Sequence, residues 1–124
     1  MDISQTQFEK IVADVIDNLP PKIHEKINNV AIFVEDFPTD EQLKKVRMRN
    51  KFGLFGLFEG YAQAKKVNFG PVLPDRITIF RVPICTSFTT EAECINQIET
   101  TVKHEIAHHF GSDEKGAAKA GRRK

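Results

Sequence analysis

Three of the chain's four histidines lie in one short segment, as His104, His108 and His109. In an α-helix, His104 and His108 would lie on one side, about one turn from each other, where they can bind the same metal ion. Glu105 would project beside them, in a position to take a proton from a water molecule bound to that metal. The residue types and their spacing therefore predict a catalytic zinc site.

A catalytic zinc ion usually has three protein ligands, so the sequence must supply one more. Cys94 lies ten residues earlier in the same predicted helix, about 15 Å away, which is too far. His24 could reach the site only through a contact that the sequence does not predict. Asp113 and Glu114 follow Gly111, which can end the helix and turn the chain back. Carboxylate oxygens are ordinary zinc ligands, so both acids remain candidates.

The helix that must position these residues is expected from about residue 90 to residue 110. Apolar residues recur through it at core spacing: Ile95, Ile98, Val102 and Ile106. On a helical wheel, His104 and His108 lie away from this stripe, whereas His109 falls within it. We therefore expect the first two histidines to face a cleft or solvent. His109 is expected to be a structural histidine of the core rather than a ligand.

Two further helices are expected in the first half of the chain. An amphipathic pattern predicts one from about residue 4 to residue 18, with Pro20 and Pro21 ending it and forcing an extended link. A short helix with a solvated outer face is expected after Thr39. Three pairs of residues have the spacing of a capping box: Ser4 with Gln7, Thr39 with Gln42, and Thr90 with Glu93.

Two short β-rich segments predict a small sheet. Residues 30–34 are continuously apolar, which is typical of a central strand covered on both faces. Residues 77–82 alternate partly with polar residues and lie near prolines, which favours an edge strand. An ordinary edge strand is expected, with pairing to an extended peptide as the functional alternative. Residues 52–61 hold three glycines and four aromatics and predict a loop packed on the core, or a wall or lid of a cleft.

The chain of 124 residues, 40% hydrophobic and 28% charged, is long enough for one domain and too short for two. Its overall charge of +1 combines +5 in residues 115–124 with −4 in residues 1–114. We expect a folded domain over residues 1–114 and a basic, poorly ordered tail over residues 115–124. The acidic body argues against nucleic-acid binding there, which leaves the tail as the only candidate for such contacts.

The sequence contains neither a secretory signal nor an apolar run of about 20 residues that could cross a bilayer. We therefore expect a cytoplasmic protein with no membrane partner. Cys85 and Cys94 are then expected to stay reduced, as small buried residues of the core.

The pattern from His104 to Glu114 resembles the metzincin signature His-Glu-x-x-His-x-x-Gly-x-x-His, with an acid in the last place. It resembles more closely the small bacterial minimal zincins, a family of predicted metallopeptidases of about this length, with the motif near the C-terminus. Residues 74–81 also resemble a strand of that family. The resemblance implies an α+β, zincin-like fold in which a small mixed sheet packs against an N-terminal helix and a C-terminal active-site helix.

Position by position, the resemblance implies Zn²⁺ ligands at His104 and His108 and a general base at Glu105. It also implies an acidic third ligand, which is Glu114 by spacing, with Asp113 as the alternative because the two acids are adjacent. The sequence departs from true metzincins in one respect. No methionine follows Glu114, so the Met-turn beneath the metzincin site is not expected.

The leading hypothesis is a zinc metallopeptidase acting on a peptide or protein substrate. One alternative is a non-catalytic zinc-binding domain that presents the segment of residues 52–61 to a partner. A third hypothesis, a metal-dependent hydrolase of nucleic acid, rests only on the basic tail. The sequence does not define the substrate or the oligomeric state.

Overall fold

The computed structural model describes residues 1–60 and 74–110. Its helices and strands, in chain order, are α1 (Gln5–Asp17), α2 (Pro21–Lys26), β1 (Val30–Glu35), α3 (Asp40–Lys45), the 3₁₀ turn η1 (Lys51–Gly53), β2 (Gly56–Glu59), β3 (Asp75–Phe80), α5 (Arg81–Ser87) and α6 (Glu91–Phe110). The strands form one sheet in the order β1-β3-β2. Strand β3 pairs parallel with β1 and antiparallel with β2, so the sheet is mixed.

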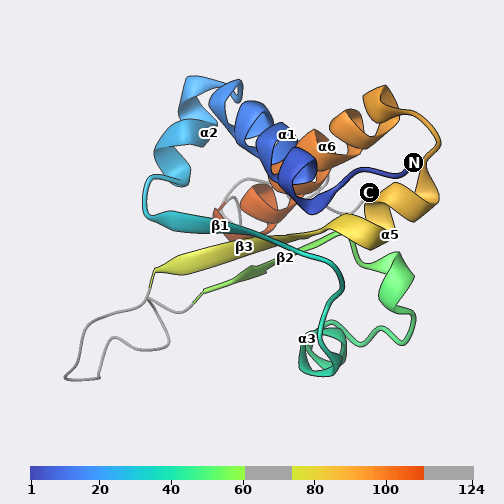
Figure 1. The fold of residues 1–124 in the computed structure, drawn as a ribbon. Helices are drawn as coiled ribbons and strands as arrows, with labels where there is room; N and C mark the ends of the chain where they lie inside the picture. The colour runs from blue at the N-terminus through green and yellow to red at the C-terminus, as the bar shows by residue number, and fades with distance from the viewer. Residues whose placement is uncertain (61–73, 111–124) are drawn as a thin grey trace.

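Helices α1 and α6 lie side by side on one face of the sheet, and α3 lies beyond the other face (Figure 1). The main core fills the space between α1, α6 and the sheet. It includes the fully buried residues Ile3, Phe8, Ile77, Ile79, Ile84, Cys94, Ile98 and Val102. A smaller apolar cluster lies under α3 and consists of Leu43, Leu54, Leu57 and Phe80. The α+β architecture expected from the sequence is therefore confirmed.

The order of the strands differs from the prediction. Strand β1 was expected at the centre but lies at an edge, and β3 was expected at an edge but lies between β1 and β2. The apolar run of β1 is misleading because Phe33 remains 43% exposed, with the guanidinium carbon of Arg76 4.2 Å from the centre of its ring. The polar residue Thr78 in β3 is fully buried, and its hydroxyl accepts a hydrogen bond from Arg76.

Two prolines that were expected to end secondary structure lie in the first turn of a helix. Pro21 is the first residue of α2, so the link expected after α1 is limited to residues 18–20, in which Pro20 has an extended backbone. Pro83 lies in the first turn of α5, which begins at Arg81 and ends β3 two residues earlier than predicted. Proline is tolerated in the first helical turn because its missing N–H has no partner within the helix there.

The capping pairs form as their spacing predicts. Thr39 and Gln42 exchange both hydrogen bonds of a capping box at the start of α3. Thr90 and Glu93 do the same before α6. At α1 the Ser4 hydroxyl accepts from the amide of Gln7. Local side-chain bonds of this kind fix where each helix begins, which is why the sequence locates these starts well.

The segment of residues 52–61 is more regular than predicted as far as residue 60. It contains the end of η1 and the whole of β2, where a loop was expected. Pairing with β3 over the register Gly56 with Ile79 to Glu59 with Arg76 gives this glycine-rich stretch its extended form. Strand β2 also contacts α6, so it forms a wall beside the helix that carries the histidines.

Candidate metal centre

His104 and His108 lie on α6 with their ring centres 5.8 Å apart and an angle of 28° between the ring planes. The His104 side chain is 25% exposed and His108 is exposed. The buried stripe of the helix, which includes Ile98, Val102 and Ile106, faces the core instead. Two adjacent imidazoles on the accessible side of a helix suit a shared zinc ion, since neutral imidazole is a common zinc ligand.

Glu105 lies between the histidines and β2. Its Oε1 accepts a hydrogen bond of 3.0 Å from the main-chain amide of Phe58. Its Oε2 lies 3.9 Å from Nε2 of His104, and the side chain is 15% exposed. One carboxylate oxygen therefore accepts a hydrogen bond from the sheet, while the other lies near a ring nitrogen of His104. Sequence reasoning missed this contact of the Phe58 amide, because the two residues are 47 positions apart and no local pattern links them.

His109 is not the buried core histidine that its place on the helical wheel suggested, because it is exposed. Its ring stacks on that of Phe58, with the centres 3.7 Å apart and 19° between the planes. The buried stripe of α6 reaches Ile106, and at position 109 the neighbour is β2 instead. His109 therefore packs against the same strand that binds Glu105.

The candidate third ligands, Asp113 and Glu114, lie outside the residues that the structure describes. Within residues 1–60 and 74–110, no group of three or more His, Cys, Asp or Glu side chains is arranged to hold a metal ion. Cys94 is fully buried, and Nε2 of His24 on α2 lies 3.4 Å from the carbonyl oxygen of Asp17. The two imidazole donors of the histidine pair fit zinc.

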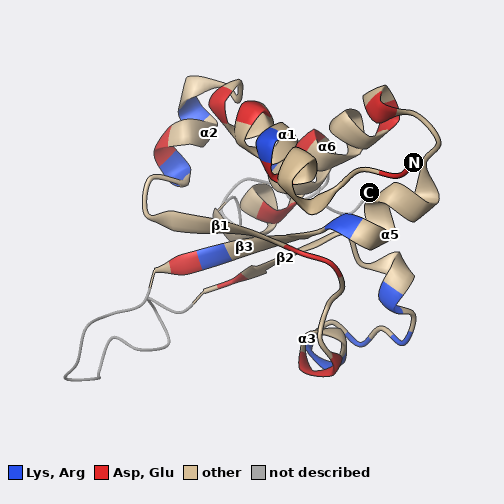
Figure 2. Ribbon diagram, viewed as in Figure 1, with Lys and Arg blue, Asp and Glu red and all other residues tan. Residues whose placement is uncertain are grey.

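A buried carboxylate at the end of β2 has a structural role. Glu59 is 8% exposed and binds Lys45 of α3 at 2.8 Å and Gln42 at 3.1 Å, with Arg76 at 4.0 Å. Burial alone would raise the pKa of Glu59, but the hydrogen bonds from Lys45 and Gln42 and the charges of Lys45 and Arg76 outweigh it and lower the pKa. The ion pair of Lys45 and Glu59 links α3 to β2, and Figure 2 shows the charged residues of these two elements.

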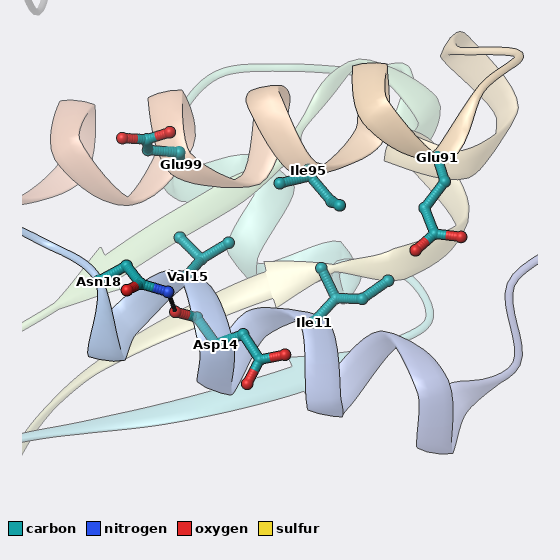
Figure 3. Close-up of a pocket in the computed structure, with 7 residues that line it drawn as sticks. All are labelled: Ile11, Asp14, Val15, Asn18, Glu91, Ile95 and Glu99. Atoms are coloured by element: carbon teal, nitrogen blue, oxygen red, sulfur yellow. Dashed lines mark hydrogen bonds between the residues drawn. The ribbon is translucent and has the colours of Figure 1, made fainter.

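Two grooves lie away from the histidine pair. One, of about 240 Å³, runs between α1 and α6 and is shown in Figure 3; it is lined by Ile11, Asp14, Val15, Asn18, Glu91, Ile95 and Glu99. The other, of about 410 Å³, lies between α1 and β1. Neither groove is lined by His104, Glu105 or His108.

Cys85 and Cys94 are both buried and not joined in a disulfide, as expected. Burial raises the pKa of the Cys94 thiol. In the described part of the chain, no helix is long and apolar enough to cross a membrane.

The mixed sheet, with α6 beside its β2 edge, agrees with a zincin-like fold. A family model described as zincin-like metallopeptidase matches residues 27–121, which is most of the chain. The protein therefore belongs to the zincin-like metallopeptidase family, which implies zinc binding and suggests a hydrolase that acts on peptides. No curated protein matches the chain.

Proposed function

We propose that the protein is a zinc-dependent peptidase in which His104 and His108 bind the metal and Glu105 is the general base. The observation that carries the proposal is the place of the Glu105 carboxylate. One oxygen accepts the Phe58 amide, and the other lies 3.9 Å from Nε2 of His104. A base must be held in hydrogen-bond reach of the proton that it takes, and this arrangement holds Oε2 beside a ligand atom.

A zinc ion held by His104 and His108 would supply Lewis-acid chemistry: it would make water more acidic and would polarise the carbonyl group of the scissile peptide bond. Glu105 Oε2 accepts a proton from the attacking water and passes it to the nitrogen of the leaving amine. The Phe58 amide stays bound to Oε1, so the carboxylate keeps its orientation during both proton transfers. Glu114 completes the ligand set by its spacing from His108, with Asp113 as the alternative.

The sequence-based idea that residues 77–82 align the substrate by main-chain pairing is wrong. This segment contributes β3, and both edges of β3 are already paired, with β1 and with β2. The site on α6 lies instead next to β2.

The proposal is tested by elemental analysis and peptide hydrolysis with the wild type, Glu105→Gln and His108→Ala. We expect about one zinc per chain in the first two proteins and little zinc in His108→Ala, since two donors remain from three. Only the wild type should cleave a broad peptide library. Glu105→Gln is the matched control because it keeps the shape of the side chain and removes the base.

Wild-type protein that contains no zinc after purification without chelator would contradict the metal site. Full zinc occupancy with no cleavage of any peptide would reject the peptidase and favour the non-catalytic zinc-binding domain. In that case the zinc would be structural, and its removal with a chelator should lower the melting temperature of a protein that has no peptidase activity.

A further inference from the structure

Strand β2 and helix α6 contact each other at regularly spaced residues. Two residues of a strand span about 6.6 Å and four residues of a helix span about 6 Å, so every second strand position can meet every fourth helix position. The strand positions are Gly56, Phe58 and the following Gly60, and the helix positions are Thr101, Glu105 and His109. The catalytic glutamate occupies the middle of this series.

The first contact leaves no room for a side chain at position 56. A Cβ atom on Gly56 would lie 2.5 Å from Cγ2 of Thr101, a distance that real Cβ atoms do not show. It would also lie 3.2 Å from the carbonyl oxygen of Thr78 and 3.3 Å from Cδ1 of Ile79. Gly56 therefore lets the main chain of β2 approach α6 closely.

The second contact uses a main-chain group that an edge strand leaves unpaired. The amide of Phe80 donates to the carbonyl of Phe55, which fixes the alternation of the ladder between β2 and β3. By that alternation, the amide of Phe58 points away from β3. Glu105 accepts it at 3.0 Å, and a hydrogen bond to a charged acceptor strongly restrains the orientation of the side chain.

We infer that Gly56 and Thr101 are positioning residues for Glu105. The close packing of Gly56 on Thr101 sets the distance between β2 and α6, and this distance decides whether the Phe58 amide reaches Oε1 of Glu105. The inference rests on the proposed role of Glu105 as general base, because its effect on turnover follows from that role. A side chain at position 56 would push β2 from α6, lengthen this bond and release the carboxylate from its place beside His104.

The test compares Gly56→Ala, Thr101→Ser and the double variant with the wild type. Thr101→Ser removes the Cγ2 atom that would clash and keeps the hydroxyl that accepts from Gln97. Gly53→Ala is the matched control, because a Cβ atom there would meet only the flexible end of Met48, at 3.1 Å. Each protein is assayed for zinc content, for hydrogen exchange of the Phe58 amide by NMR, and for kcat and KM on a peptide that the wild type cleaves.

We expect Gly56→Ala to lower kcat by about 10- to 100-fold, since a small misplacement of a catalytic group is enough for such a loss. Zinc content and KM should stay within about twofold, and exchange of the Phe58 amide should become faster. Adding Thr101→Ser should restore most of kcat and most of the protection. Full recovery is not expected, because the contacts with Thr78 and Ile79 remain.

Two results would overturn the inference: an unchanged kcat in Gly56→Ala despite an exposed Phe58 amide, or a loss that Thr101→Ser does not reverse. If Gly56→Ala does not fold, Glu105→Ala provides the second measurement. The Glu105→Ala variant leaves Gly56 and Thr101 in contact but removes the acceptor of the Phe58 amide, so hydrogen exchange of this amide should become faster. An unchanged exchange rate would also overturn the inference. The NMR measurement needs no substrate, so it separates a failure of this inference from a failure of the peptidase function.

Discussion

Glu105 is more buried than the two histidines beside it. Its side chain is 15% exposed and bound to the main chain of β2, whereas His104 is 25% exposed and His108 is exposed. A group that is to take and release a proton needs a fixed orientation. At the scale of single residues, the hydrogen bond from Phe58 orients the carboxylate that is proposed as the general base.

The identity of the third ligand gives a prediction at this scale. We expect Glu114→Ala to weaken zinc binding by at least about 100-fold, because a lost ligand costs more than a lost partner of a ligand. Asp113→Ala is the matched control and should bind zinc almost as the wild type does. Competition with a chromophoric chelator measures both constants. If Asp113→Ala weakens zinc binding and Glu114→Ala does not, Asp113 is the third ligand. If neither variant changes the zinc dissociation constant, neither acid is a ligand.

At the scale of elements, β2 depends on α3 for its position as well as on β3. The carboxylate of Glu59 at the end of β2 is buried among Lys45, Gln42 and Arg76. Because the pKa of Glu59 is lower in the folded protein, this contact stabilises the fold above the ordinary pKa of about 4.5. The contribution is lost as the pH falls through the lower, folded-state pKa.

Removing the cation should therefore destabilise the protein in a pH-dependent way. We expect Lys45→Met to lower the free energy of unfolding by about 1–2 kcal/mol at pH 7, since it deprives a buried carboxylate of a charged donor. Urea denaturation from pH 7 to pH 3 should show this difference shrinking below about pH 4.5. Lys44→Met, one residue away on α3, should show no such trend. A difference that is constant with pH would mean that packing, rather than charge, is lost.

At the scale of the whole molecule, the extent of the folded domain remains a proposal. The composition of residues 115–124 suggests that they are dispensable, but the family match continues to residue 121. We expect chains ending at residue 114 and at residue 121 to have melting temperatures within about 2 °C of the full chain, because terminal residues whose only apolar side chains are alanines add little to a core. Both should retain zinc.

Differential scanning calorimetry and elemental analysis check this boundary. A shorter chain that melts much lower, when the chain ending at residue 121 does not, would place residues 115–121 within the domain. The same truncations test the weakest functional hypothesis. If the full chain binds RNA or DNA and the shorter chain binds equally well, the basic tail is not responsible.

The sequence by itself determined the features that depend on near neighbours in the chain. The spacing of His104, Glu105 and His108 needs only a helix to bring them together, and the Thr90 and Glu93 pair starts that helix where predicted. Helix α1 and the buried stripe of α6 follow from apolar periodicity in the same way. These patterns are local, so the sequence records them directly.

Only the tertiary structure decided what lies around that motif. The central and edge positions predicted for β1 and β3 were exchanged in the structure. The position of a strand depends on which elements cover it, and the apolar run of β1 does not show that. The bond between Phe58 and Glu105 joins residues 47 positions apart, and no periodicity encodes such a pair. His109 is exposed and stacks on the Phe58 ring of β2, a contact that the helical wheel of α6 does not predict. The motif can be read from the chain, but the hydrogen bond that orients Glu105 depends on the packing of β2 against α6.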